Sequence, residues 1–572
     1  MVWAVVPILL GVYLLTMSPT VGLIDSGELA AGCYLLNILH PTGYPLWTML
    51  GRLATLVPLG RVVNRVAVMS GLLAATGVGL FLLLGQKLGL GPSAVGGAAL
   101  VLGLSVPVWA VAVDVEVYSL TLVLAVLVFW AAEGVDTARG LLLFAYLAGL
   151  SLTNHMSGLS VVLGAALAVL GKLGRSFWRR LPVLILFGLL GLSPYLFLII
   201  RARAGPLFAW GNPVNLERFW WHVTGRQYQV WMFSLPMAEV VRNAGRGLGI
   251  IARSFGFVLL VPVLIGVYRL VKTRLSLALG LLATVFLSFF YAINYSISDI
   301  ESYYIPCVLG LALFCAVGLD SLRALVRPLQ HLGWVVGLVL LIVNFNSLGR
   351  QGDYVAYDEA MNTLASTESN AIIITDWWDL YAPVFYLQNV EKVRPDVCIV
   401  DKELVRRSWY LNYLAKAYPW LIERSKPELE RYRSYLDQFE HNRLKDPEAI
   451  QACFIVLLRS FVLRNPERPA YTTIFPESGR DGRELLAGFR LVPVGLLLQI
   501  REDSLIPEFD WTRLRVRIPR LRLDERTRAN LERYRRFALL RARLLTELGQ
   551  GQEAQAVLNW LRTAFEPLEA GH

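Results

Sequence analysis

The chain has 572 residues, of which 55% are hydrophobic and 17% are charged. Soluble globular proteins average about 45–50% apolar and about 25% charged residues. These values exclude an ordinary soluble enzyme and a disordered protein, and they indicate a polytopic membrane protein. The chain has a net charge of +11, of which +10 belongs to residues 1–347 and only +1 to residues 348–572. The positive charge therefore belongs to the membrane part, which argues against nucleic-acid binding.

About eleven segments approach the ~20 apolar residues that a membrane-spanning helix needs. They lie near residues 3–17, 62–84, 93–110, 117–133, 140–153, 155–171, 181–200, 246–269, 276–294, 303–320 and 331–347. Polar residues interrupt the stretch 140–171, which is either two short helices or one broken helix. Residues 1–17 have no basic start and no small-residue cleavage site, so we expect a retained first span rather than a signal peptide.

The short basic loops predict the orientation of the chain, because such loops remain cytoplasmic. They carry Lys87, Arg139, Lys172, Arg175, Arg179, Arg180, Arg269, Lys272, Arg274, Arg323 and Arg327. We therefore expect a multi-pass protein of the plasma (inner) membrane with its N-terminus in the cytoplasm and residues after 347 outside.

The acidic residues of the membrane part gather on the predicted outer side, at the ends of helices. A transporter more often keeps ionisable groups near the bilayer midplane. The pattern favours an active site at the membrane boundary, and a transporter or flippase of lipid-linked saccharides remains the alternative.

The polar C-terminal half predicts an extracytoplasmic α/β domain at 348–510. A strand at Ala371–Thr375, a helix near 380–390 and a strand at Val397–Val400 form a β-α-β pattern. Further strands are expected at 454–459, 472–475 and 491–500. Residues 511–572 read as a basic linker and a C-terminal helix pair similar to one tetratricopeptide hairpin. Five cysteines form no Cys-x-x-Cys motif and no Cys/His cluster, which argues against a zinc site. Cys398 and Cys453 either pair or remain buried thiols.

The first external loop, residues 18–61, places Asp25 and Glu28 three positions apart, just before an uncharged helix at Leu29–Leu39. This spacing is close to a capping box, which alone would explain both residues. Two carboxylates at the membrane boundary are nevertheless costly unless they are paired or used. The residues alone leave the structural and the functional interpretation open.

The segment DSGEL…HPTGYPL…LGRL resembles the start of a membrane family whose animal member is a GT-C-class protein O-mannosyltransferase. Further similar blocks follow in the same order: WAVAVDVEVYSL (109–120), GLSLTNHMS (149–157), LGLSPYLFLIIRAR (190–203), WGNPVNLERFWWHVTGRQY (210–228), SDIESYYIP (298–306) and LQNVEKVRPDVCIV (387–400). The resemblance implies a GT-C-like helical fold and an active site on the non-cytoplasmic face. It also implies a polyprenyl-linked sugar donor and an essential carboxylate in the first external loop, where Asp25 falls.

We therefore predict that Asp25 is the general base, which must reach the proton of the acceptor hydroxyl. Glu28 either orients the acceptor, binds the sugar or caps the helix. The leaving phosphate needs positive charge, for which arginine is suited. The candidates for donor phosphate binding are Arg201, Arg203, Arg226 and His40. Snorkelling to the interface is the alternative for Arg201 and Arg203, and a buried turn histidine is the alternative for His40.

Other polar residues at helix ends are candidates for substrate binding. They are Tyr44, Glu116, Tyr118, Asn154, His155, Tyr228, Asp299 and Tyr303. Asn154 and His155 have helix-to-helix hydrogen bonding as their alternative role. Trp109, Trp210, Trp220 and Trp221 suit an aromatic belt at the membrane interface, with sugar stacking as the alternative.

The predicted architecture is an α-helical, GT-C-like transmembrane domain at 1–347, with external loops at 18–61 and 201–240, followed by the two C-terminal parts. The predicted function is transfer of a monosaccharide, with mannose as the candidate, from a polyprenyl-phosphate donor to a hydroxyl of an extracytoplasmic protein or glycan. The expected partners are the lipid bilayer, the donor and the acceptor. No cofactor is required by the sequence, and a divalent cation is left open.

Overall fold

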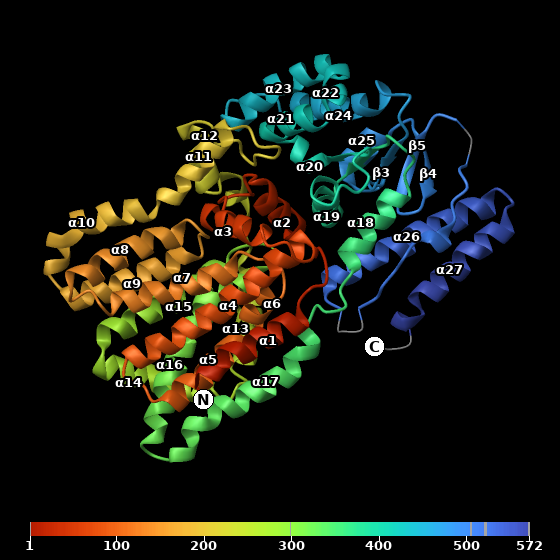
Figure 1. The fold of residues 1–572 in the computed structure, drawn as a ribbon. Helices are drawn as coiled ribbons and strands as arrows, with labels where there is room; N and C mark the ends of the chain where they lie inside the picture. The colour runs from red at the N-terminus through yellow and green to blue at the C-terminus, as the bar shows by residue number, and fades with distance from the viewer. Residues whose placement is uncertain (1, 298, 504–505, 520–522, 570–572) are drawn as a thin grey trace. The chain divides into compact units, whose positions relative to one another are not determined.

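A computed structural model describes residues 2–297, 299–503, 506–519 and 523–569 (Figure 1). Unit 1 comprises Met1–Ser18, Ile38–Ala204 and Pro213–Gln351, and unit 2 comprises Pro19–Asn37, Gly205–Asn212 and Gly352–His572. Parts of both predicted external loops, residues 19–37 and 205–212, therefore belong to the same unit as the C-terminal half.

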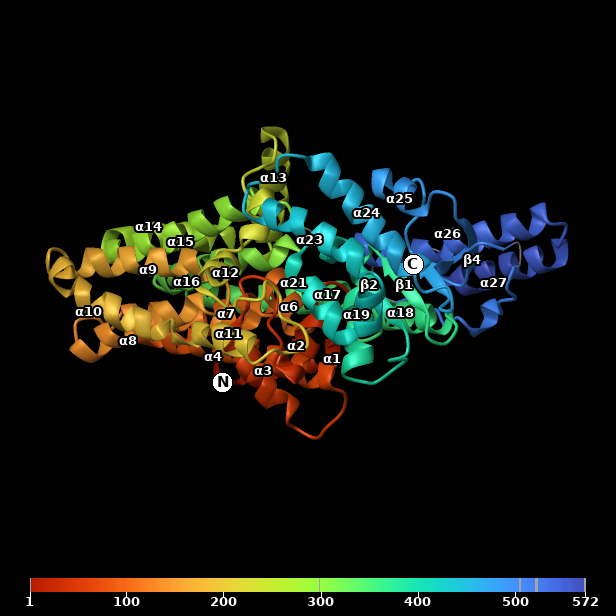
Figure 2. The same cartoon turned by 90° about the horizontal axis from the view of Figure 1, so that it is seen from above.

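Unit 1 is built from helices. They are α1 (Val5–Thr16), α3 (Pro45–Thr55), α4 (Val62–Lys87), α5 (Pro92–Leu104), α6 (Val106–Ala112), α7 (Tyr118–Ala132), α8 (Ala138–Leu152), α9 (Gly158–Leu173), α10 (Ser176–Gly191), α11 (Leu196–Arg203), α12 (Leu216–Val223), α13 (Met237–Ser254), α14 (Leu260–Thr273), α15 (Leu275–Ile293), α16 (Ile305–Arg323) and α17 (Leu332–Leu348). A short 3-10 helix, η4 (Ile300–Tyr304), precedes α16. Both views show α9 and α15 side by side (Figures 1 and 2).

Five stretches of the described chain are long and apolar enough to cross a membrane, or six if α5 and α6, bent by 61° at Ser105, count as one. Shorter apolar helices add to these at α1, α7, α8 and α9. The protein is therefore a multi-pass membrane protein, while the predicted number of about eleven spans stays a prediction. The interrupted stretch 140–171 is two helices, α8 and α9.

Close contacts between helix backbones hold unit 1 together. A Cβ atom on Gly266 of α14 would lie 1.8 Å from the carbonyl oxygen of Phe314 in α16. A Cβ atom on Gly149 of α8 would lie 2.0 Å from the carbonyl oxygen of Gly188 in α10. Such small residues let helices approach closely in a membrane, where burial of apolar surface does not drive association.

The predicted span at 246–269 is wrong. The chain forms α13, leaves the helix at Phe255–Leu259, and starts again as α14. Gly256 and Phe257 take positive φ values of 55° and 58°, which end a right-handed helix. The apolar composition of the segment hid this break, and it also hid the polar character of α13, which carries Arg246 and Arg253 inside the predicted span.

Unit 2 contains a five-stranded sheet with the order β2-β1-β3-β5-β4. The strands are β1 (Ile372–Thr375), β2 (Cys398–Asp401), β3 (Ala470–Thr472), β4 (Arg490–Val494) and β5 (Leu497–Arg501). β1 pairs in parallel with β2 and β3, and β5 pairs antiparallel with β3 and β4. The predicted β-α-β pattern is confirmed, with α19 (Trp378–Asn389) between β1 and β2.

The other helices of unit 2 surround this sheet. They are α2 (Ser26–Leu35), α18 (Val355–Ala365), α20 (Lys402–Val405), α21 (Ser408–Ala417), α22 (Pro419–Arg424), α23 (Lys426–Glu440), α24 (Pro447–Leu463), α25 (Gly479–Leu486), α26 (Glu525–Glu547) and α27 (Gly551–Glu569).

Three strand predictions need correction. The segment 454–459 lies inside α24, which begins at a proline and is capped by Asp446, whose carboxylate accepts the N–H groups of Glu448 and Ala449 at 3.0 Å. The run 472–475 overlaps β3 only at Thr472. The run 491–500 is a hairpin of two strands that turns at Gly495, where φ is 54°. A short apolar run does not distinguish a buried helix from a strand.

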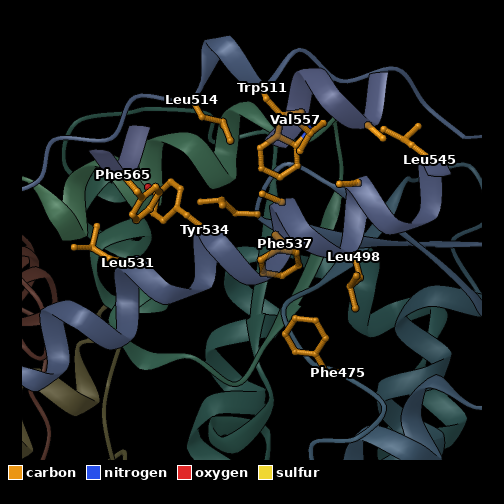
Figure 3. Close-up of a cluster of buried hydrophobic side chains, with 14 of the residues drawn as sticks. Phe475, Leu498, Trp511, Leu514, Leu531, Tyr534, Phe537, Leu545, Val557 and Phe565 are labelled. Carbon is orange, nitrogen blue, oxygen red and sulfur yellow. The ribbon is translucent and has the colours of Figure 1, made fainter. Parts of the chain in front are cut away.

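The C-terminal helix pair is part of the core of unit 2. α26 and α27 lie side by side, and their buried side chains meet Trp511, Leu514 and Leu498 in one apolar cluster (Figure 3). Phe537 of α26 contacts Phe475, with ring centroids 5.3 Å apart. The pair therefore packs onto the sheet domain.

Candidate active site

Asp25 stands at the start of α2, but its side chain makes no capping hydrogen bond to that helix in the described structure. Instead, Oδ1 of Asp25 accepts a hydrogen bond of 2.9 Å from the indole Nε1 of Trp378. Glu28 lies in the first turn of α2 and is buried. The capping explanation is therefore wrong for the Asp25 side chain, which is aimed at an aromatic residue of α19.

Close packing of α2 on α19 positions Asp25. A Cβ atom on Gly27 would lie 2.3 Å from the carbonyl oxygen of Ala382, so only glycine permits this approach. The preceding residue, Ile24, has a positive φ of 62°, and its N–H group donates to Oδ1 of Asp379 at 3.0 Å. Two contacts with α19 thus hold the backbone on either side of Asp25.

Asp379 is in turn held by α26. Its carboxylate is 3% exposed and forms an ion pair with Arg526, at 2.7 Å between Oδ1 and Nη2. The side-chain amide of Asn530 donates to the other carboxylate oxygen at 3.0 Å. A chain of contacts therefore runs from α26 through Asp379 to the loop that carries Asp25.

An aromatic cluster lies beside Asp25 within unit 2. The ring of Trp378 lies 5.7 Å from Tyr381 and 5.8 Å from Trp210, and Trp210 lies 4.7 Å from Trp409. Trp210 is buried in this cluster, and Trp109 is buried in unit 1, where its indole N–H donates to Thr16. The aromatic-belt prediction is therefore wrong for Trp210 and Trp109.

Unit 1 contains a cavity of about 380 Å³ with aromatic and apolar walls. Its lining includes three of the predicted substrate-binding residues, His155, Tyr228 and Tyr303. Tyr291 and Tyr295 line it as well. Neither tyrosine was predicted, because Tyr291 lies in the last turn of the apolar helix α15 and Tyr295 just after it, where the sequence shows no motif.

Six predicted residues of unit 1 converge on one aromatic cluster. The ring of His155 lies 5.6 Å from Tyr44, 4.6 Å from Tyr118 and 5.1 Å from Tyr303. The ring of His40 lies 5.0 Å from Tyr44 and 6.4 Å from Tyr228. Five separate segments of the chain supply these side chains, so the structure brings together residues that the sequence only suggested one by one.

Hydrogen bonds fix the ring of His155. Nδ1 accepts the N–H group of Ser157 at 3.0 Å and lies 2.9 Å from its hydroxyl. Nδ1 is therefore an acceptor, and the proton of the neutral ring sits on Nε2.

Asn154 has the structural role given as its alternative. Its buried side-chain amide donates to the carbonyl oxygen of Val117 at 3.0 Å and to the hydroxyl of Thr121 at 2.9 Å. These bonds tie the loop before α9 to α7. Asn154 does not line the cavity of unit 1.

The predicted phosphate-binding arginines lie outside the lining of this cavity. Arg203 is exposed, and its Nε donates to the carbonyl oxygen of Val214 at 3.2 Å. Arg201 is half-buried at the end of α11. The guanidinium of Arg226 lies 4.1 Å from the ring centre of Trp221.

Two predicted acidic residues are half-buried just before helices. Glu116 precedes α7 and Asp299 precedes η4. Neither is part of the cavity lining. The predicted roles of these acids in substrate binding stay predictions.

Two sequence comparisons identify relatives. Residues 25–176 match the family described as Protein O-mannosyl-transferase TMEM260 N-terminal domain, and residues 356–419 match TMEM260-associated domain 2. These two segments are similar to domains of the TMEM260 family. The predicted resemblance to a GT-C-like O-mannosyltransferase family is confirmed.

Two named proteins align with most of this chain. Protein O-mannosyl-transferase TMEM260 of Mus musculus is 29% identical over 440 residues, which cover 69% of this chain and 61% of the mouse protein. Protein O-mannosyl-transferase tmem260 of Dictyostelium discoideum is 23% identical over 465 residues, which cover 70% of this chain and 56% of that protein. The chain thus spans less than two thirds of the length of these curated relatives.

The fold is similar to that of a solved structure, ArnT from Cupriavidus metallidurans in the apo state. The TM-score is 0.50 with 14% sequence identity, and the match covers 87% of this chain and 97% of ArnT. The predicted GT-C-like fold is therefore confirmed.

Proposed function

We propose that the protein is a membrane glycosyltransferase that moves a monosaccharide from a polyprenyl-phosphate donor to a hydroxyl of an extracytoplasmic protein or glycan. The observation that carries the proposal is the carboxylate of Asp25, which does not cap its helix and is held by Trp378 on a doubly anchored loop. The names of the two relatives favour mannose as the sugar and a protein as the acceptor.

In the proposed reaction Asp25 accepts the proton of the acceptor hydroxyl. The hydroxyl oxygen attacks the anomeric carbon, the bond from that carbon to the phosphate oxygen breaks, and polyprenyl phosphate leaves with the electron pair. A single displacement of this kind inverts the anomeric configuration. The transition state has oxocarbenium character, as in glycoside hydrolysis. Glu28, one turn along α2, is proposed to orient the acceptor or the sugar.

The cavity of unit 1 supports a role in donor binding. Its walls are mostly apolar and aromatic, which suits an isoprenoid and the faces of a sugar ring. His155 and Tyr228 offer polar atoms among these walls. We assign donor contacts to His155, Tyr228 and Tyr303. We also propose that the N-terminus is cytoplasmic and that unit 2 is extracytoplasmic.

Arg201, Arg203 and Arg226 are proposed to stabilise the leaving phosphate, because one guanidinium group can donate two parallel hydrogen bonds to phosphate oxygens. Substitution of Arg201 or Arg203 by alanine should raise the KM for the donor and also lower kcat, because the phosphate gains negative charge as it leaves. An unchanged donor KM in both variants would remove these arginines from the proposal.

The same assay in EDTA tests the alternative that a divalent cation supplies the positive charge at the leaving phosphate. We expect activity to persist in EDTA. A loss of activity that Mn²⁺ restores would contradict the arginine assignment.

The function is tested with the purified full chain, radiolabelled polyprenyl-phosphate mannose and a Ser/Thr-containing peptide. The proposal predicts labelled peptide and a matching release of polyprenyl phosphate. Movement of the intact labelled lipid across a vesicle membrane without any transfer would support the flippase alternative instead.

A further inference from the structure

Helix α13 is anchored in unit 1 along one side only. Its buried residues are Gly247, Ile250, Ile251 and Ser254. A Cβ atom on Gly247 would lie 2.4 Å from the hydroxyl oxygen of Tyr304, and the side-chain amide of Asn243 donates to the carbonyl oxygen of Ile293 at 3.3 Å. The remaining sides of the helix are exposed.

Two rows of different chemistry run along the exposed sides of α13. Met237, Val241 and Leu248 are 75%, 65% and 60% exposed. The same spacing of four and then seven residues recurs in Arg242, Arg246 and Arg253. Residues at this spacing lie on one side of a helix, so the apolar residues form one row and the arginines another. The arginine row starts five positions later and therefore lies about 140° around the helix axis from the apolar row.

The arginine row has no acidic partner in the described part of the chain. Arg242, Arg246 and Arg253 are exposed and form no ion pair with any described residue; Nε of Arg253 donates to the carbonyl oxygen of Gly249 at 3.2 Å. Glu239 also lies on α13, so the helix carries three guanidinium groups and one carboxylate. The row is therefore a positively charged edge.

A hollow of about 340 Å³ opens at this edge. Arg246, Arg253 and Phe257 line it together with Gly249, Ile250 and the acidic residue Glu301. A Cβ atom on Gly245 or Gly249 would meet nothing within 4 Å. A ligand can therefore reach the helix backbone between the two rows. The hollow thus combines two guanidinium groups and one carboxylate with apolar surface, so the arginines outnumber the acid.

We propose that α13 lies in the plane of the membrane surface and binds the phosphate of an anionic phospholipid through Arg246 and Arg253. An amphipathic helix with one apolar and one basic edge binds at the lipid interface in this way. The guanidinium groups bind the phosphate oxygens, and the exposed apolar row contacts the acyl region. This site is separate from the transfer reaction and needs no sugar or acceptor.

Native mass spectrometry of the full chain in detergent tests the proposal, with phosphatidylglycerol and phosphatidylcholine as the probes. We expect the wild type to retain phosphatidylglycerol in preference to phosphatidylcholine. The double variant R246Q/R253Q should lose about tenfold in phosphatidylglycerol affinity, since it loses two charge-assisted contacts. Equal retention by this variant and the wild type, or no preference in the wild type, would overturn the proposal.

The double variant R431Q/R483Q is the matched control, because it removes two exposed arginines of unit 2 and leaves α13 intact. It should bind phosphatidylglycerol like the wild type, and a similar loss would mean that only net charge matters. Competition with millimolar inorganic phosphate tests whether the site binds soluble phosphate instead of a lipid headgroup. Inorganic phosphate should not displace the lipid, and complete displacement would mean that the site takes soluble phosphate. Equal melting temperatures of the variants show that each is folded.

Discussion

At the scale of single residues, the proposed chemistry depends on the contact between Asp25 and Trp378. The cost of a carboxylate at a membrane boundary left a structural and a functional interpretation of Asp25 open, and the family resemblance favoured the functional one. The sequence did not suggest Trp378, because 353 positions separate the two residues and no pattern along the chain pairs them. Polar residues inside apolar runs, such as His155 and Asn154, could be recognised from the sequence because each interrupts an apolar segment. His155 is in the cavity lining, whereas its neighbour Asn154 makes only structural bonds.

Substitution of Trp378 by phenylalanine keeps the aromatic packing and removes the N–H donor. We expect kcat to fall about tenfold or more, since a hydrogen bond to a charged group contributes about 1.5–3 kcal/mol, while the KM for the donor changes little. The control is W409F, because the indole N–H of Trp409 has no hydrogen-bond partner in the described structure. Steady-state transfer kinetics measure both. Equal effects of the two variants would contradict a specific contact with Asp25.

Asp401 predicts a pH-dependent stability. It ends β2, accepts the N–H group of Leu404 at 2.8 Å and is 3% exposed; burial raises its pKa to about 7. Because the pKa is raised on folding, its contribution to stability is complete below about pH 4 and is lost as the pH rises through about 7.

The variant D401N removes this titration. Its melting temperature should exceed that of the wild type by more at pH 8 than at pH 5, when both proteins are followed by thermal unfolding of the full chain. D437N, which removes an exposed carboxylate, is the control. A difference between D401N and wild type that stays constant from pH 5 to pH 8 would contradict the raised pKa.

At the scale of elements, the C-terminal helix pair has a role that its sequence did not reveal. The pattern predicted two helices, and α26 and α27 are both present. What α26 contacts depends on tertiary packing: Arg526 pairs with Asp379, and Asp379 accepts the N–H group of Ile24. Strand and span predictions failed for related reasons. The runs 454–459 and 246–269 are both apolar, which does not reveal their structure. The run 454–459 is helical, and the run 246–269 is broken between two helices.

Removal of Arg526 should both destabilise the protein and slow transfer. R526A leaves the buried carboxylate of Asp379 without its cation, which costs about 3 kcal/mol, and it loosens the loop that carries Asp25. The double variant D379N/R526A should recover part of the lost stability, because no unpaired charge stays buried. R536A, on the same helix, removes an exposed ion pair with Glu477 and should have a small effect. Melting temperature and kcat are the measurements. R526A and R536A variants of equal stability and activity would contradict the role of this pair.

At the scale of the whole molecule, each unit contributes different chemistry. Unit 1 supplies helices that can cross the membrane and a cavity with aromatic walls. Unit 2 supplies Asp25 on a loop braced by α19 and α26. Composition and family resemblance predicted the helical membrane part and the GT-C-like fold. They did not predict that residues 19–37 belong to the same unit as the C-terminal half, because that grouping depends on contacts between distant segments.

The central claim is that Asp25 is the base of a sugar transfer, and the most direct test compares turnover and donor binding in D25N. Asparagine keeps the size and an oxygen that can accept the indole hydrogen bond of Trp378, but it cannot take a proton. We predict donor affinity equal to that of the wild type and a fall in kcat of about 10²-fold or more, as expected for loss of a general base. A D25N protein that binds the donor and transfers sugar at a rate near that of the wild type would contradict the account.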